Sequence, residues 1–413
     1  MTSNRFPVPP PPSNDPDLLA DVAAATSLRE GREGVAGIVR TVAGEGPLAL
    51  RDLARLVRMP LPVVSAVRRE LESRGLFERG QGVGLTAAGR AFAAEALGLA
   101  TAPEGVRDEA DRRPPRRTPA RAVEGAEDGL DQLLVPLLPA MEAHVADGPP
   151  VDVTLDQAPC TAETALRRAL AMHRAGALAG RHILLVGDDD SLSIAIGLVA
   201  KAVSALPRRL AVLELDPGRI AHLKRGAALH GINFEPVAHD LRDPAPEALA
   251  GAFDVVATDP PYTLEGMALF VSRGIEALGF GPGLKFFLSY ADLSPDDRLD
   301  LQQRLTELGL AILRMRPSFN RYGGASILGS VGQFIELETT SRTRSALAGE
   351  RFDAAIYTGE VRPRLRSYRC TACGLATPVG TGEAFATIEA LKAAGCPRCG
   401  GHVFERQRGA RPG

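Results

Sequence analysis

Beyond residue 180 the chain alternates short apolar segments with segments of helical spacing, and this alternation limits the fold more than any other feature. The expected strands are 182–186, 210–215, 234–238, 253–258, 285–290, 311–316 and 333–338. The helices between them are expected to begin near Ser191, Pro217, Thr263 and Asp296. Strands that alternate with helices form parallel sheets with crossover helices. The sequence therefore predicts a doubly wound α/β domain over residues 130–362.

Residues 17–100 follow the order of a winged helix. Helical spacing over 50–59 is broken at Pro60 and resumes over 63–74, and a glycine-rich, hairpin-like segment follows over 77–86. In proteins that bind DNA, the second helix of this motif contacts the bases. Its exposed face here would carry Arg68, Arg69 and Arg74. The motif also serves as a dimerisation or lid element in enzymes, and we expect that structural role and a homodimer.

Two segments are expected to lie outside the folded domains. Residues 1–16 contain a run of prolines that cannot pack as a helix or a central strand, so they are expected to be a disordered lead. Residues 101–129 are rich in charge and proline, which is typical of a linker.

The C-terminal region, 363–408, contains two close pairs of cysteines. Cys370 and Cys373 are separated by 22 residues from Cys396 and Cys399, and glycines follow each pair. Four thiolates at this spacing are typical of a zinc ribbon, in which the metal is tetrahedral and has no open position. We therefore expect a structural zinc ion rather than a catalytic one.

Charge and hydropathy exclude several classes of protein. The 413 residues include 48 Lys and Arg against 50 Asp and Glu, a formal net charge of −2. No general basic field attracts nucleic acid, which is therefore not a favoured partner. No apolar stretch approaches the ~18 residues of a membrane span, and the polar N-terminal segment does not resemble a secretory signal. A cytoplasmic protein without a membrane partner is expected.

In an open parallel sheet the ligand binds beyond the carboxyl ends of the strands. The first expected strand runs into the acid turn, Gly187-Asp188-Asp189-Asp190. If S-adenosylmethionine bound here, three carboxylates would repel its carboxylate. They would attract its decarboxylated form, which lacks that group, or a polyamine. Neighbouring acids also raise one another's pKa, which suits one of them to accept a proton. One of the three acids can alternatively cap the following helix.

Acids end the next strands as well. Glu214 and Asp216 follow the second strand, where an acid normally binds ribose hydroxyls. Asp240 follows the third strand and could hold the adenine amino group. The fourth strand ends in a rigid turn with two prolines that presents Asp259 and Tyr262, a carboxylate and an aromatic face that both suit an amine. This Asp-Pro-Pro-Tyr turn also occurs in methyltransferases acting on exocyclic amines of nucleobases, so by itself it leaves the amine open.

Together these motifs resemble a known family. The seven-strand order resembles the Rossmann-like sheet of S-adenosylmethionine-dependent transferases. The motifs that occur in the same order as in the branched-chain polyamine synthases, or N(4)-bis(aminopropyl)spermidine synthases, are Asp156-Gln157, 160–164, Arg168, 187–191, 214–216, 240–242, 259–261 and 318–322. The family transfers aminopropyl groups from decarboxylated S-adenosylmethionine to the secondary amine of spermidine and releases methylthioadenosine.

The resemblance implies roles for individual residues. Asp189 would lie near the attacking nitrogen as proton acceptor, and the other two acids of the turn would pair with further ammonium groups. The cofactor-binding positions implied are Gln157, Gly187, Asp188, Asp190, Glu214, Asp216 and Asp240. Two other functions stay open at this point. One is an amino-methyltransferase acting on nucleic acid, and the other is a ligand-sensing regulator that binds DNA.

Overall fold

The computed structural model describes residues 17–80, 82–99, 131–151, 155–323, 331–347, 349–357, 366–380, 383–385 and 387–407. The expected lead, the expected linker and the expected domain boundary at residue 362 lie outside these residues. The chain divides into two compact units, of which the first is Met1–Thr101 with Gly281–Gly283.

The first unit is mainly helical. Its elements are α1 (Leu18–Ala25), α2 (Gly31–Glu45), α3 (Leu50–Val57), α4 (Leu61–Ser73), β1 (Phe77–Arg79), β2 (Val83–Leu85) and α5 (Ala87–Leu97). Arg58, the C-cap of α3, has a φ of 56° that reverses the chain, and Pro60 is the N-cap of α4. β1 and β2 pair as an antiparallel hairpin. The order helix, turn, helix and hairpin is the expected one, and a winged-helix role for it stays a prediction.

The prediction for Arg68 was wrong. We expected it on the exposed face of α4, but its side chain is only 8% exposed and pairs with Glu72 one turn later. Arg69 and Arg74 are exposed, as expected. Arg68 follows Val67 and stands four residues after Val64, so the width of the buried stripe of α4 carries its aliphatic part into the core. The exposed basic surface of α4 is therefore smaller than its sequence indicates.

The second unit contains the predicted seven-stranded sheet. The strands are β3 (His182–Val186), β4 (Arg209–Glu214), β5 (Glu235–Ala238), β6 (Val255–Thr258), β7 (Lys285–Ala291), β8 (Leu310–Arg321) and β9 (Val331–Thr339). They lie side by side in the order β5-β4-β3-β6-β7-β9-β8. The pairs from β5 to β7 are parallel, and β9 is antiparallel to both β7 and β8. The strand order reverses at β3, beside β6, and this reversal creates the crevice.

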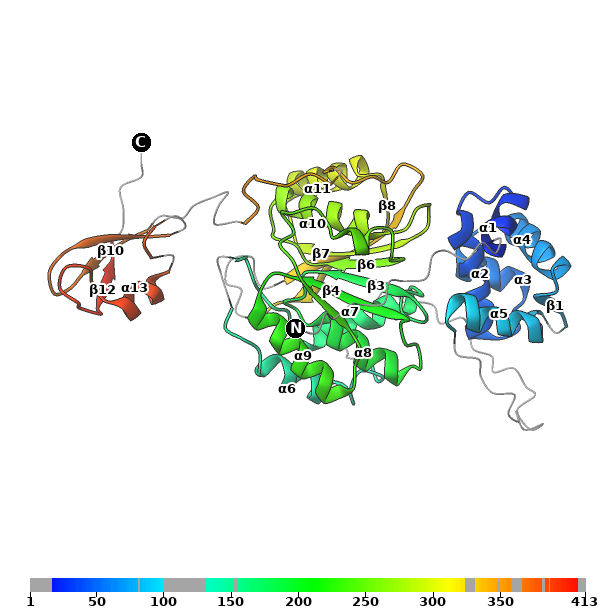
Figure 1. The fold of residues 1–413 in the computed structure, drawn as a ribbon, viewed down its shortest axis with the longest axis horizontal. Coiled ribbons are helices and arrows are strands. Elements are labelled where there is room, and N and C mark those ends of the chain that lie inside the picture. The colour runs from blue at the N-terminus through cyan, green and yellow to red at the C-terminus, as the bar shows by residue number, and fades with distance from the viewer. Residues whose placement is uncertain are drawn as a thin grey trace, which may run out of the picture. The chain divides into compact units, whose positions relative to one another are not determined.

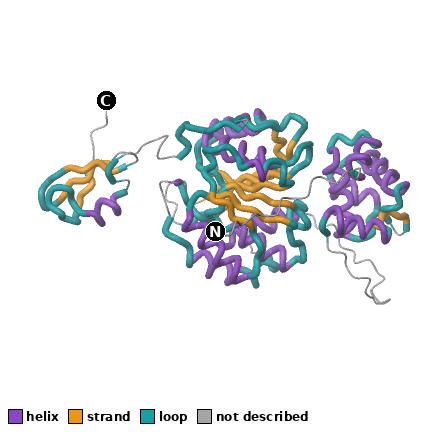
Figure 2. Tube along the Cα trace, viewed as in Figure 1, coloured by secondary structure: helices purple, strands orange, loops and turns teal. Residues whose placement is uncertain are grey.

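Helices cover both faces of this sheet, as Figures 1 and 2 show. The helices of one face are α6 (Leu138–Ala146), α7 (Ala162–Arg174), α8 (Leu192–Ala202) and α9 (Pro217–His230), and those of the other are α10 (Leu264–Ala277) and α11 (Pro295–Glu307). Alternate residues of β3 enter the two cores: Ile183 and Leu185 pack on the first face, and Leu184 and Val186 on the second. Both faces of the central strand are therefore dry, which explains its unbroken apolar run.

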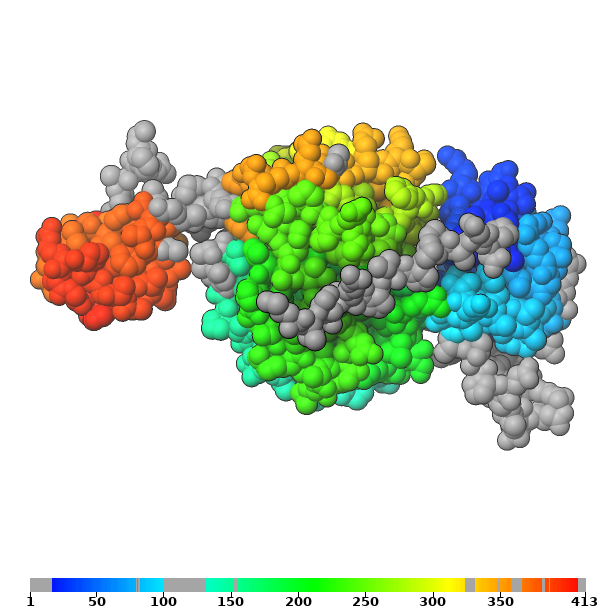
Figure 3. Space-filling view, viewed as in Figure 1, coloured from blue at the N-terminus to red at the C-terminus, as the bar shows by residue number. Residues whose placement is uncertain are grey.

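The chain that follows β9 returns across α10 (orange in Figure 3). Arg273 of α10, which is fully buried, fixes this segment by donating to the carbonyl oxygen of Glu350 at 2.6 Å. The same guanidinium donates to the carbonyl oxygen of Leu241 at 2.9 Å, after β5. One buried side chain thus joins the returning segment to the carboxyl edge of the sheet.

The cysteine region forms a small sheet with β10 (Arg366–Cys370) between β11 (Ala376–Val379) and β12 (Phe404–Arg406), together with α13 (Ile388–Ala394). The two cysteine turns have matching backbone bonds. Gly374 donates to the carbonyl of Cys370 at 2.9 Å, and Gly400 donates to that of Cys396 at 2.8 Å. Across the part of the chain that the structure describes, every helix is too short or too polar to cross a bilayer.

Candidate active site

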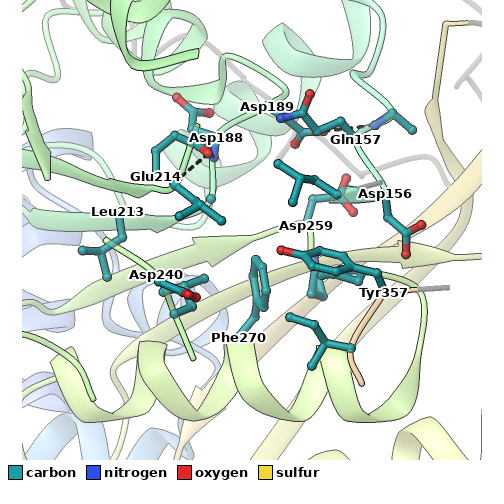
Figure 4. Close-up of a pocket in the computed structure, with 18 of the residues that line it drawn as sticks. Asp156, Gln157, Asp188, Asp189, Leu213, Glu214, Asp240, Asp259, Phe270 and Tyr357 are labelled. Carbon is teal, nitrogen blue, oxygen red and sulfur yellow. Dashed lines mark hydrogen bonds between the residues drawn. The ribbon is translucent and has the colours of Figure 1, made fainter. Parts of the chain in front are cut away.

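A cavity that is partly open to solvent lies at the carboxyl ends of β3, β4, β5 and β6, where the strand order reverses (Figure 4). Its described lining is Leu155, Asp156, Gln157, Ala158, Gly187, Asp188, Asp189, Leu213, Glu214, Leu215, His239, Asp240, Leu241, Asp259, Pro260, Pro261, Tyr262, Phe270, Ile356 and Tyr357. The sequence-predicted residues at the ends of four separate strands are therefore brought together.

Asp188, the first acid of the turn, caps a helix. Its side chain accepts hydrogen bonds from the backbone of Leu192 at 2.6 Å and of Ser193 at 3.2 Å, at the start of α8. Gly187 before it has a φ of 75°, which permits the sharp exit from β3. Burial raises the pKa of Asp188 to about 7, although the two backbone bonds oppose this shift. The N-terminus of α8 thus stabilises the negative charge of ionised Asp188.

Asp190, the third acid, has a partner inside the protein. Its carboxylate forms an ion pair with Arg168 of α7 and accepts a hydrogen bond from the backbone of Cys160. Burial acts to raise its pKa, but the charge of Arg168 and the hydrogen bonds from Asp259, Cys160 and Arg168 together outweigh burial, so the pKa of Asp190 lies below its usual range. The expected pairing of Asp190 with a ligand ammonium group therefore gives way to an internal pair, and Asp190 does not line the large cavity.

Asp189 lines the cavity, and among the described residues neither an ion pair nor a helix terminus compensates its charge. One of its oxygens accepts a hydrogen bond of 3.1 Å from the backbone of Ala158. Burial, and then the charges of Asp190 and Asp259, raise its pKa well above the usual range for an aspartate. A carboxylate with a raised pKa at a ligand site is suited to accept a proton at neutral pH.

Glu214 and Asp216 at the end of β4 differ in their access to the cavity. Glu214 lines it and accepts three backbone hydrogen bonds, from Leu215 and Asp216 at 2.9 Å each and from Asp188 at 3.0 Å. Asp216 is not part of the lining. It caps α9 by accepting from Gly218 at 2.7 Å, and it accepts a bond of 3.2 Å from the side chain of Gln157. Asp216 thus orients a lining residue.

Asp240, beyond β5, lies at the other end of the cavity (Figure 4). Its carboxylate accepts a hydrogen bond of 3.0 Å from the backbone of Arg242, which fixes the turn. Leu213, Leu241 and Phe270 line the cavity near it and supply apolar surface. An acid beside apolar walls is suited to bind a flat ring through its faces and through an amino group at its edge.

Asp259, after β6, is held by two donors. One of its oxygens accepts from Arg168 at 2.9 Å and from the hydroxyl of Tyr322 at 2.8 Å. Burial and the nearby charge of Asp190 raise its pKa to about 7, against the lowering effect of Arg168. Tyr262, three residues later, lines the same cavity and meets the rings of Tyr290 and Tyr322 edge to face, at centroid distances of 5.4 and 6.1 Å.

The cavity is strongly acidic. Six carboxyl groups line it, from Asp156, Asp188, Asp189, Glu214, Asp240 and Asp259, and its described lining contains no Lys or Arg. Because a partly buried charge interacts over several ångströms with little screening, this lining favours a cationic ligand and disfavours a phosphate or a carboxylate.

The comparison with protein families tests the family resemblance that these motifs indicate. The sequence model of a family described as the branched-chain polyamine synthase A C-terminal domain matches residues 137–378, which is more than half of the chain. The chain belongs to the branched-chain polyamine synthase family. The resemblance drawn from the motifs is thereby confirmed.

Individual relatives agree with this membership. An uncharacterized protein of Methanocaldococcus jannaschii is 33% identical over 389 residues, covering 94% of this chain and 92% of the relative. The N(4)-bis(aminopropyl)spermidine synthase of Thermus thermophilus is 32% identical over 279 residues, covering 66% of this chain and 74% of that protein. The crystal structure of the C9 mutein of the Thermus thermophilus branched-chain polyamine synthase, in complex with N4-aminopropylspermidine and 5'-methylthioadenosine, has a TM-score of 0.50 and 27% identity, covering 83% of this chain and 96% of that one.

The family match includes Cys370 and Cys373 but ends before Cys396 and Cys399. The four sulfur atoms lie within 4.8 Å of one another. The Sγ atoms of Cys370 and Cys399 are 3.6 Å apart, and those of Cys373 and Cys396 are 3.5 Å apart. Tetrahedral zinc with bonds of about 2.3 Å needs sulfur atoms about 3.8 Å apart, so this donor set fits the ion.

Three residues of the family motifs received no role from the sequence, and the structure gives them one. Arg168, Asn320 and Tyr322 form a buried network around Asp190 and Asp259. For Arg168 a signal was present, because it stands in the apolar stripe of α7, between Ala165 and Met172. An arginine in such a stripe needs a buried acidic partner.

Among the other missed lining residues are Asp156, His239, Phe270, Ile356 and Tyr357. Asp156 was part of a motif without an assigned role. The ring of Tyr357 lies 5.5 Å from the guanidinium of Arg242, and the carbonyl of Ile356 accepts a hydrogen bond from Thr263. No local pattern in the sequence indicates that the segment after the last strand returns to the cavity.

Proposed function

We propose that this protein transfers an aminopropyl group from decarboxylated S-adenosylmethionine to an amine of a spermidine-like polyamine and releases methylthioadenosine. The observation that carries the proposal is the acidic cavity, whose described lining holds six carboxyl groups and no Lys or Arg. Both substrates of this reaction are cations without an acid group. The family membership and the ligands named for the Thermus thermophilus structure support the same reaction.

The donor would occupy the β4 and β5 side of the cavity. Glu214 would accept hydrogen bonds from the ribose hydroxyls, and Asp240 from the adenine amino group between apolar walls. Gln157, held by Asp216, would line the same end, so Asp216 would contribute indirectly. Gly187 and Asp188 would bring the backbone and one carboxyl group close to the sulfonium. The acids near this turn would repel the additional carboxylate of ordinary S-adenosylmethionine.

The acceptor amine would bind between Asp189, Asp259 and Tyr262. Its nitrogen must lose a proton to expose the lone pair, and Asp189 would accept that proton. The neutral nitrogen then attacks the propyl carbon next to the sulfonium, in line with the carbon–sulfur bond, whose electrons pass to sulfur. Holding the two reacting atoms in this geometry contributes ~7 kcal/mol or more to barrier lowering.

The four cysteines would bind one structural zinc ion. With four thiolates the ion has no open coordination position, so it would stabilise the C-terminal region rather than act on the substrate. The homodimer expected from the sequence stays a prediction.

The test is product analysis with purified protein. We would incubate it with S-adenosylmethionine or its decarboxylated form and with spermidine, spermine or a nucleic acid, and measure product masses. An aminopropyl gain on a polyamine, with methylthioadenosine formed in equal amount, supports the proposal. A methyl gain on nucleic acid, or ligand binding without any product together with salt-sensitive DNA binding, would refute it.

A further inference from the structure

An inner cavity lies behind the acid turn. Asp189 and Asp259 line both this cavity and the large one, together with Gly187 and Asp188. The inner cavity is also bounded by Arg168 and by polar and aromatic side chains of β6, β7 and β9, namely Thr258, Ser289, Phe287 and Phe334. It is narrow, with room for about one water molecule. The inner cavity therefore joins Asp189 and Asp259 on a side that is too narrow for a substrate to fill.

All three nitrogens of the buried guanidinium of Arg168 have partners. Nε donates to Asn320 at 2.8 Å, Nη1 to Asp190, and Nη2 to both Asp259 at 2.9 Å and the hydroxyl of Tyr322 at 3.0 Å. The side chain is 1% exposed. Asn320 is itself held by donating to the carbonyl of Gln333 at 2.7 Å. One guanidinium thus faces two carboxyl groups, those of Asp190 and Asp259. When one of these two groups is protonated, the positive charge of Arg168 balances the single negative charge that remains.

The single proton shared by these two carboxyl groups resides on Asp259 rather than on Asp190. Arg168 keeps Asp190 ionised, and burial with the charge of Asp190 raises the pKa of Asp259 to about 7. Tyr322 opposes this rise, since its hydroxyl donates to Asp259 at 2.8 Å and so favours the ionised form. The two forms of Asp259 are therefore close in energy near neutral pH.

We propose that Asp259 is the second proton site of the transfer, and that Arg168 and Tyr322 are positioning residues that hold it ready for this role. The N–H bond of the acceptor amine breaks as an O–H bond forms on Asp189, and the electron pair stays on nitrogen. The proton then passes across the inner cavity to the carboxylate of Asp259, which regenerates Asp189. It leaves to solvent after the product departs. This inference rests on the proposed aminopropyl transfer.

The experiment compares pH profiles of kcat for the whole protein and for Tyr322→Phe. Loss of the hydroxyl removes one hydrogen bond to ionised Asp259, which raises its pKa by about one unit. The acid limb of the profile is expected to move up by about one pH unit, so that kcat falls about tenfold on that limb and recovers at higher pH. KM for the polyamine and the affinity for methylthioadenosine are expected to change less than about twofold.

Tyr290→Phe is the matched control. It removes a buried tyrosine hydroxyl that is outside the network and does not line the cavity, and its profile is expected to match that of the unaltered protein. An unshifted acid limb in Tyr322→Phe, or an equal loss of kcat at every pH, would overturn the proposal. Should that variant fail to fold, Asp259→Asn replaces it. Its kcat should be low and should lack the acid limb, and an unchanged limb overturns the inference. Absence of aminopropyl product from the unaltered protein would instead refute the proposed function and this inference with it.

Discussion

The substitution Asp189→Asn removes the proposed proton acceptor while keeping the local structure. The side chain accepts one hydrogen bond, from the backbone of Ala158 at 3.1 Å, and an asparagine oxygen can accept the same bond. The substitution removes a carboxyl group whose pKa is raised mainly by burial, so it should not lower the stability of the fold. General-base catalysis contributes roughly 10²–10⁴ in rate. We therefore expect kcat to fall by at least about 100-fold, which is ~2.7 kcal/mol.

The assay is single-turnover formation of aminopropylated polyamine, followed by mass spectrometry, with methylthioadenosine affinity measured by calorimetry. That affinity should change little, because methylthioadenosine carries no positive charge for Asp189 to attract. Asp296→Asn, an isosteric change at an exposed position in the first turn of α11, is the control and should keep full activity. Turnover of Asp189→Asn within about threefold of the unaltered protein would refute the assignment.

Three further predictions concern the network, the acids and the metal. Arg168→Met leaves Asp190 and Asp259 buried without their cation and should destabilise the fold by about 3–5 kcal/mol in thermal unfolding; a loss below about 1 kcal/mol would contradict the network. Polyamine affinity, measured by calorimetry, should rise from about pH 6 to 8, and binding should release protons. The reason is that a bound cation favours the ionised forms of Asp188 and Asp259, whose pKa values are about 7. A flat or falling affinity would argue against a polyamine site beside these two acids. Cys396→Ser should abolish stoichiometric zinc by elemental analysis, whereas Cys160→Ser, outside the cluster, should retain it; zinc retained in Cys396→Ser would exclude the four-thiolate site.

Much of the sheet could be predicted because its strands are short apolar runs that end abruptly. β3 has the expected bounds, since Gly187 and three acids follow its last apolar residue. β8 and β9 are longer than expected. β8 continues to Arg321 past Pro317 and Ser318, the latter with a φ of 55°, and the pairing resumes with a register shift between Arg316 and Asn320. Such irregular pairing depends on the neighbouring strand, which periodicity cannot express.

The position of the site was predictable because parallel strands end at the same edge of the sheet. Which acid faces the ligand was not. Asp188 and Asp190 carry the same side chain as Asp189 in consecutive positions, and only the helix terminus after one and the guanidinium beside the other distinguish them. Likewise Tyr357 enters the cavity through a chain path fixed by Arg273, a contact between distant segments. Sequence-local reasoning assigns residue types to an edge, but tertiary partners assign the roles.

The acidity of the cavity has a consequence for turnover. Alkyl transfer erases the sulfonium charge, so the adenosyl fragment arrives as a cation and remains as a neutral thioether. The carboxyl groups near the sulfur atom then no longer attract the by-product by charge, whereas the hydrogen bonds proposed for its ribose and adenine stay available. Loss of the sulfonium charge thus weakens the binding of the spent nucleoside as a direct result of the chemistry.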